Sequence, residues 1–147
     1  DAGNVYSTGY FQGTVDFDPG DGVFNLTSQG SHDAFISKLD TDGNFIWAKQ
    51  FKGDGSVRGY SIALDSSGNI YSSGLYDGGW TDFDPGPDEF LLFSQTHHIT
   101  YVSKLDNNGE FVWAKLIWGW NDVVSGVSIS LDNSSNVYIG GHFKGTV

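Results

Sequence analysis

The sequence predicts an all-β repeat protein, and three observations support this fold class. Segments recur at a fixed spacing of 66 residues, so that residues 35–40 return at residues 101–106. Aromatic residues make up 16% of the chain and Gly supplies 21 of its 147 residues, whereas there are only 3 Pro. No stretch places apolar residues at helical spacing over a useful length. A fixed period of this size is typical of a repeat architecture.

Other segments recur in the same order. The run Phe-Ile-Trp-Ala-Lys at 45–49 returns as Phe-Val-Trp-Ala-Lys at 111–115, and Asp-Phe-Asp-Pro-Gly at 16–20 returns at 82–86. The run Gly-Asn-Val-Tyr at 3–6 has related copies at 68–71 and 135–138. The chain therefore contains all or part of three copies of one repeat unit.

Each period is expected to form four strands. In the middle copy these are residues 59–64, 70–76, 100–105 and 110 to about 117. They are rich in β-branched and aromatic residues and are separated by Asp, Asn and Gly turns, which is typical of strands. A loop of roughly twenty residues between the second and third strands carries the Asp-Phe-Asp-Pro-Gly motif. Four antiparallel strands per period predict the blade of a β-propeller.

The whole chain is then expected to be part of a single propeller. Residues 1–56 would supply strands two to four of a partial blade, 57–122 a complete blade, and 123–147 the first two strands of another. Because repeat arrays need neighbours or caps to cover their apolar faces, we expect further blades from the rest of a longer chain or from other copies.

The repeat resembles the bacterial β-propeller repeat family (SBBP-like, related to the NHL-type propellers). The residues that carry the resemblance are the runs at 61–65, 68–71, 37–40 and 43–47. The resemblance implies that the strand ending at Leu64 is innermost. It also implies a bacterial protein that is secreted or displayed at the cell surface. The long loop with its Asp-Phe-Asp-Pro-Gly element is an addition that the shorter NHL-type repeat lacks.

Charge and composition restrict the partners. The chain has 18 acidic and 7 basic residues, a formal net charge of −11, so nucleic acid is not expected to bind. It contains no Cys, which excludes disulfides and thiolate metal sites. No apolar run approaches the length of a membrane helix, so no membrane insertion is expected.

The duplicated Asp-Phe-Asp-Pro-Gly element is the first candidate site. Alternate carboxylates before a tight turn can direct hard oxygen ligands at one point, as calcium requires. The alternative is an Asx-type turn in which each Asp caps backbone amides. The candidate calcium ligands are Asp16, Asp18, Asp21, Asp82, Asp84 and Asp88.

Aromatic residues outside the repeat are the second candidate. Trp80, Trp118 and Trp120 have no Trp at the matching positions, and the two loops that carry them would emerge on the same face. With Asp122 or Asp82 alongside, they could stack on sugar rings and accept hydrogen bonds from the hydroxyls. The alternative is that they are buried, as large aromatic side chains usually are.

These observations favour a non-enzymatic extracellular module for binding, adhesion or display, with a protein or glycan ligand and calcium as a stabilising ion. The alternative left open is a fragment of a propeller-type polysaccharide hydrolase or lyase. No Ser lies in a nucleophile elbow. The copies are nearly identical at the inner strand, whereas catalysis at a propeller axis needs unlike residues from different blades.

Overall fold

The computed structural model describes residues 3–95, 98–117 and 123–144, and these residues form an all-β structure. None of them belongs to a helix long and apolar enough to cross a membrane. The strands in this part of the chain are β1 (Val5–Phe11), β2 (Thr14–Asp16), β3 (Asn25–Thr27), β4 (Asp33–Leu39), β5 (Phe45–Gly53), β6 (Val57–Leu64), β7 (Ile70–Tyr76), β8 (Gly79–Asp82), β9 (Leu91–Ser94), β10 (Ile99–Leu105), β11 (Phe111–Ile117), β12 (Val123–Leu131) and β13 (Val137–Lys144).

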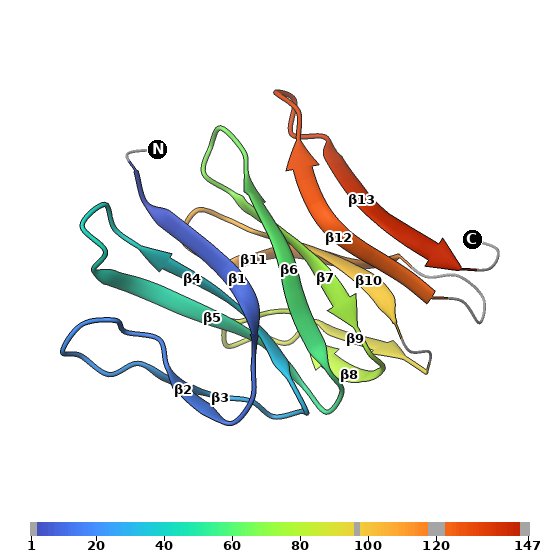
Figure 1. Cartoon of the computed structure of the whole chain (residues 1–147), viewed down its shortest axis with the longest axis horizontal. Coiled ribbons are helices and arrows are strands. Elements are labelled where there is room, and N and C mark those ends of the chain that lie inside the picture. Colours follow the sequence, from blue (N-terminus) through green and yellow to red (C-terminus); the bar gives the residue numbers. More distant parts are fainter. Residues whose placement is uncertain (1–2, 96–97, 118–122, 145–147) are drawn as a thin grey trace.

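The strands form successive blades that lie side by side (Figure 1). β1, β4 and β5 make the first blade, and β12 with β13 makes the third. The second blade has the strand order β11-β10-β7-β6, with every pair antiparallel. β6 lies at the edge of this blade and contacts both β1 and β12. The structure confirms the predicted fold class, a propeller fragment with one complete and two partial blades.

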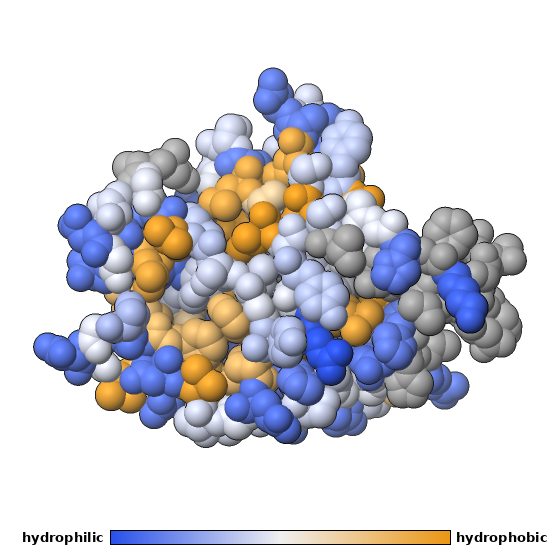
Figure 2. All heavy atoms as spheres, viewed as in Figure 1, coloured by the Kyte–Doolittle hydropathy of each residue, from blue (hydrophilic) through white to orange (hydrophobic). Residues whose placement is uncertain are grey.

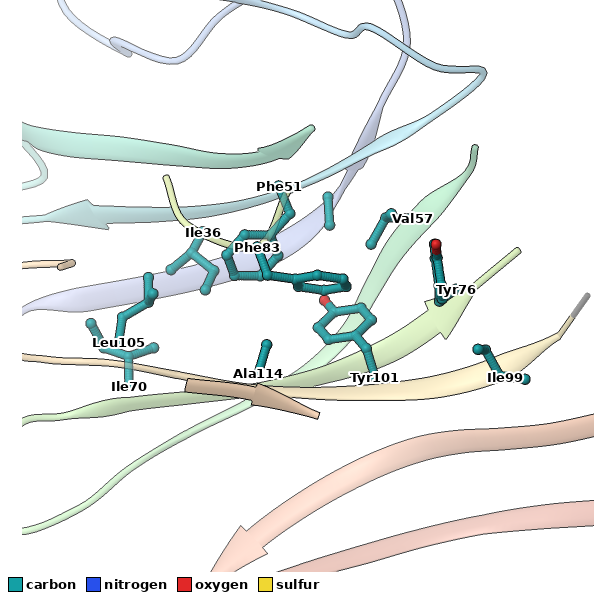
Figure 3. Packing of buried hydrophobic residues seen from close by; sticks show 11 residues of the cluster. Ile36, Phe51, Val57, Ile70, Tyr76, Phe83, Ile99, Tyr101, Leu105 and Ala114 are labelled. Carbon is teal, nitrogen blue, oxygen red and sulfur yellow. The ribbon is translucent and has the colours of Figure 1, made fainter. Parts of the chain in front are cut away.

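The main hydrophobic core fills the layer between the first two blades. Phe51, near the end of β5, packs against Phe83 and Tyr101 of the second blade, with ring centroids 5.2 and 5.9 Å away. Phe83 also packs against Tyr101 at 5.3 Å, and the three rings are at most 1% exposed (Figure 3). Burial of large aromatic side chains contributes strongly to packing energy, so this cluster joins the two blades.

The second blade is covered on both faces, because successive side chains of a strand point to opposite sides. Every residue of β7 is buried. Ile70 belongs to the core shared with the first blade, whereas Tyr71 packs with Ile129 in the layer shared with the third blade. The Ile129 N–H also donates to the Ser61 hydroxyl at 3.1 Å, which links β12 to β6.

The same aspartate turn recurs at four strand connections. In the turn after β6, Asp65 Oδ1 accepts the N–H groups of Ser67 and Asn69 at 2.9 and 3.0 Å. Burial acts to raise the pKa of Asp65, but its bonds with Asn69 and Ser67 and the charge of Lys104 bring that pKa below its ordinary value. The other turns place the same two bonds on Asp40, Asp106 and Asp132.

Apolar side chains remain exposed on the outer blades. Val5 on β1 is 52% exposed and Tyr138 on β13 is 57% exposed, and Figure 2 shows patches of apolar residues on one face. In the second blade the residue that matches Val5 is Ile70, which is fully buried beneath the first blade. The comparison shows that packing against the first blade covers this repeat position in the second blade.

The connection between β7 and β10 differs from the sequence-based expectation. Instead of an irregular loop, it contains β8 and β9, which pair antiparallel with Trp80 opposite Phe93. We call residues 79–94 the insertion hairpin. The sequence pattern misses it because its strands have four residues each and the Gly and Pro between and around them are also typical of turns.

Candidate binding surface

The insertion hairpin of the second blade also extends the sheet of the first. β8 pairs antiparallel with the end of β5 through Lys52 opposite Asp82 and Gly53 opposite Thr81. The Lys52 ammonium lies 3.7 Å from Asp82 Oδ2, which adds an ion pair to the main-chain contact. The two blades are therefore joined by strand pairing as well as by packing of their faces.

The backbone of Trp80 is fixed by this pairing. The Asp54 N–H donates to the Trp80 carbonyl at 3.0 Å, and the Trp80 N–H donates to Asp54 Oδ1 at 2.6 Å. A Cβ on Gly53 would lie 2.1 Å from the Trp80 carbonyl oxygen, so a residue with a side chain would push the strands apart. The close approach of β5 and β8 therefore depends on glycine at this position.

Tyr76, the last residue of β7, attaches the insertion hairpin to the second blade. Its hydroxyl lies within hydrogen-bond distance of the carbonyl oxygens of Gly79 and Leu92, at 3.1 Å for Leu92. Burial raises the pKa of Tyr76 above its ordinary 10.0, so the hydroxyl keeps its proton and remains a donor. Both strands of the hairpin are thus attached to the core of the second blade.

The outward face of the hairpin carries three large apolar side chains. Trp80 is 50% exposed, Phe93 45% and Leu91 49%. The Trp80 and Phe93 rings are tilted against each other with centroids 4.7 Å apart. We call these three residues the aromatic surface. They form a compact apolar strip on a hairpin whose backbone is held at both strands.

The matching hairpin of the first blade has a polar pair at the same place. Thr14 and Thr27 lie 66 residues before Trp80 and Phe93 and are also directly opposite each other. Their hydroxyl oxygens are 2.9 Å apart and hydrogen-bonded. The hairpin therefore does not need aromatic residues at this position, and the Trp80–Phe93 pair is a feature of one repeat.

The duplicated Asp-Phe-Asp-Pro-Gly element forms the same turn in both copies. Asp16 Oδ1 accepts the N–H groups of Phe24 and Asp18 at 2.8 and 3.0 Å, and these two bonds lower the pKa of Asp16. Asp18 Oδ1 accepts the Gly20 N–H at 2.8 Å. In the second copy Asp82 and Asp84 make the equivalent bonds. Capping of backbone amides, the alternative role, is therefore present in both copies.

Calcium binding at these loops stays a prediction. No group of three or more His, Asp or Glu side chains placed to hold a metal ion occurs within residues 3–95, 98–117 and 123–144. Asp16 is exposed and Asp18 half-buried, whereas Asp82 is 4% exposed and Asp84 half-buried. The last two candidate ligands, Asp21 and Asp88, are exposed.

The remaining candidate residues divide into two groups. Trp118, Trp120 and Asp122 lie outside the described residues. Trp80 is at the surface, and the sequence-based choice misses its partners Phe93 and Leu91. Phe93 could have been identified from the sequence, because Thr27 occupies the matching position in the first repeat.

Comparisons with known proteins agree with this architecture. Residues 46–86, from β5 to the turn after β8, match the family model described as a beta-propeller repeat. The chain is 31% identical, over 149 residues, to an uncharacterized WD repeat-containing protein of Acanthamoeba polyphaga mimivirus. The match covers 96% of this chain and 11% of that protein, so the chain spans about a tenth of its length.

The 66-residue repeat and the antiparallel blades joined by the insertion hairpin define this chain as a repeat protein. Within this fold, residues 46–86 match the β-propeller repeat, and the antiparallel blades of the described residues agree with that match. The relative reported above is viral, so the bacterial origin implied by the resemblance stays a prediction.

Proposed function

We propose that this chain is part of a non-enzymatic β-propeller module that binds a protein partner through the aromatic surface. The exposed Trp80–Phe93 pair carries this proposal, because it stands on a hairpin with fixed backbone. Aromatic residues, and Trp above all, are enriched among the residues that contribute most to protein–protein binding. A preorganised site also loses less conformational entropy when the partner binds.

The surroundings of the pair favour a protein over a glycan. A sugar-binding site combines an aromatic floor with polar groups that orient the hydroxyls. Here the neighbouring side chain on the same face is Leu91, and the Oδ1 atom of Asp54 is already engaged by the Trp80 N–H. Asp82 is 4% exposed and close to Lys52. An apolar strip of this kind fits apolar side chains of a partner.

The inner strands support a scaffold role. Ser61 on β6 accepts a hydrogen bond from the Ile129 N–H on β12, so its hydroxyl serves the packing of blades. Small residues stand at related positions of both strands, Ser61 and Ala63 on β6 and Ser128 and Ser130 on β12. Similar residues in successive blades suit a scaffold better than the alternative polysaccharide hydrolase or lyase. The proposed setting, adhesion or display outside the cell with calcium as a stabilising ion, rests on the family resemblance and the duplicated aspartates.

The test replaces the aromatic pair with the pair that the chain itself uses in its other hairpin. The double variant Trp80→Thr, Phe93→Thr installs the arrangement of Thr14 and Thr27, so the hairpin is expected to keep its fold. Peptides selected from a random display library on the wild-type chain are titrated calorimetrically into both proteins. We expect the double variant to bind them at least about tenfold more weakly, since about 1.4 kcal/mol corresponds to a factor of ten.

Two results would contradict the proposal. Equal affinity of the selected peptides for both proteins would show that they bind elsewhere. A glycan array on which the wild type binds and the double variant does not, together with no peptide binding, would assign the surface to a glycan. Circular dichroism of the double variant is the control for folding.

A further inference from the structure

Arg58 is the only arginine of the chain, and it has no carboxylate partner among the described residues. The chain carries 18 Asp and Glu against 7 Lys and Arg. The ion pairs in the described part of the chain are made by Lys49, Lys52, Lys104 and His98. In so acidic a chain, a guanidinium without a carboxylate beside it needs an explanation.

Three strands bring Arg58 beside an aromatic and an imidazole ring. Tyr10 stands near the end of β1, His32 directly precedes β4, and Arg58 is near the start of β6. These strand ends are neighbours, because Tyr10 is opposite Ala34 and His32 bridges to Ser56. The guanidinium carbon lies 5.5 Å from the centre of the Tyr10 ring, and Nη2 lies 3.4 Å from His32 Nδ1. The Tyr10 and His32 rings meet edge to face with centroids 5.3 Å apart. We call these residues the Arg58 cluster.

The donors of Arg58 exceed the acceptors around it. A guanidinium has five N–H groups and no acceptor. His32 Nδ1 must therefore be the acceptor of the one hydrogen bond that the structure gives to the guanidinium. Nε is buried without a partner. Nη1 has no acceptor among the described residues, and Arg58 as a whole is half-buried. The guanidinium is thus held in place, but several of its N–H donors have no hydrogen-bond acceptor among the described residues.

The cluster belongs to one position in the repeat. The residue that matches Arg58 in the third blade is Ser125, 67 positions later, and the residue that matches Tyr10 in the second blade is Leu75. A role in the ordinary contact between blades would call for similar residues in both. The Tyr10 ring is also 49% exposed, so the cluster is open to solvent beside the guanidinium.

We propose that the Arg58 cluster binds a carboxylate group. The terminal N–H groups of Arg58 can pair with both oxygens of a carboxylate, which is the geometry that a planar guanidinium favours. Contact with the Tyr10 ring and the bond to His32 hold the guanidinium in place before the ligand arrives. The Arg58 cluster does not involve the aromatic surface.

The charge of the chain decides between a carboxylate and a phosphate. Both groups suit a guanidinium. A phosphate carries more negative charge than a carboxylate at neutral pH and is repelled more strongly by a chain of net charge −11. The singly charged carboxylate gains the same paired hydrogen bonds against a smaller repulsion.

The single arginine makes the test specific, because the chain has one Nε–Hε resonance of an arginine side chain. The ¹⁵N-labelled chain is titrated with sodium acetate, and separately with sodium phosphate and sodium chloride at the same ionic strength. We expect acetate to move this resonance along a saturating curve with a dissociation constant on the order of millimolar. Chloride should give no saturating shift, and phosphate should bind more weakly than acetate.

Variants and peptides complete the experiment. Arg58→Lys keeps the charge but removes the planar pair of N–H donors that binds both carboxylate oxygens. Acetate should therefore bind at least about tenfold more weakly, as measured at the backbone amide of Gly59. Trp80→Thr, Phe93→Thr should leave the acetate response unchanged, which separates this site from the proposed protein-binding surface. An amidated peptide with one internal Glu and a Glu-free peptide with a free C-terminus distinguish the two sources of carboxylate. Equal shifts with acetate and chloride, tighter binding of phosphate, or an unchanged Arg58→Lys variant would each overturn the proposal.

Discussion

Asp54 and Trp80 hold each other through two hydrogen bonds, one from each backbone N–H. The Asp54 amide binds the Trp80 carbonyl, and the Trp80 amide binds the Asp54 carboxylate. This pair continues the β5–β8 ladder by one step beyond Gly53 and Thr81. It is the point at which the interface between two blades also determines the position of an exposed tryptophan.

We expect Asp54→Ala to loosen this connection. The Trp80 N–H would lose its acceptor at a cost of about 1 kcal/mol. Amide hydrogen exchange at Trp80 should then become about fivefold faster, provided that exchange occurs through local opening. Asp54→Asn keeps a side-chain oxygen and is the matched control, with a smaller change expected. Unchanged exchange in Asp54→Ala would show that the side chain does not hold the strand.

Phe51 and Ile117 form a matched pair for testing the core. Ile117 follows Phe51 by 66 residues and occupies the same place on β11, but it is 42% exposed, whereas Phe51 is 1% exposed. Phe51→Ala should lower the free energy of unfolding by about 3–5 kcal/mol, because it leaves a cavity beside Phe83 and Tyr101. Ile117→Ala should change it by no more than about 0.5 kcal/mol. Urea denaturation measures both, and equal effects would contradict the assigned core.

The aspartate turns should make stability fall in acid. The pKa of Asp106 is held below its ordinary 3.8 chiefly by the N–H of Glu110, as those of Asp40 and Asp132 are by Asn44 and Asn136. A carboxylate with a lowered pKa in the folded state contributes stability above pH 3.8, which is lost as the pH falls through the folded pKa. We therefore expect urea midpoints to fall below about pH 4.

Protonation of other carboxylates also relieves the repulsion in a chain of net charge −11, which acts in the opposite direction. The variant Asp106→Asn isolates the turn, because it removes one titrating group and keeps a side-chain oxygen. Its stability should fall less steeply below pH 4 than that of the wild type. Parallel curves for the two proteins would show that the turn contributes nothing to the acid response.

The calcium prediction can be tested at the duplicated loops. If Asp16 and Asp18 bind one ion and Asp82 and Asp84 another, calorimetry should record heat on addition of calcium to the chain. Asp84→Asn should then reduce the number of sites by one and leave the loop of the first copy active. No heat with the wild type, or the same heat with both proteins, would leave these aspartates with capping alone, the role that their bonds to backbone amides already show.

Sequence reasoning locates the repeated strands well, because alternation of side chains and turn chemistry are local properties. The strands expected at 70–76 and 100–105 appear as Ile70–Tyr76 and Ile99–Leu105. It misses β8 and β9 because each strand has only four residues and lies among Gly and Pro residues that are also typical of turns.

For the binding surface, the most informative sequence comparison is between matching positions of the two repeats. Trp80 is identified from the sequence because it interrupts the repeat, and the structure supplies Phe93, which stacks on it. Arg58 is overlooked because a single Arg in a strand carries no pattern. Its candidate role in binding follows from the structure, in which the rings of Tyr10 and His32 lie beside it and no carboxylate among the described residues pairs with it.

Attachment of the insertion hairpin through backbone atoms has an evolutionary consequence. Strand pairing depends on N–H and C=O groups, which every residue other than proline provides, so substitutions on the outward face leave the attachment intact. After a repeat duplicates, its hairpin can therefore acquire new side chains without rebuilding the blade. The change between the Thr14–Thr27 pair and the Trp80–Phe93 pair within this one chain is an example of such divergence.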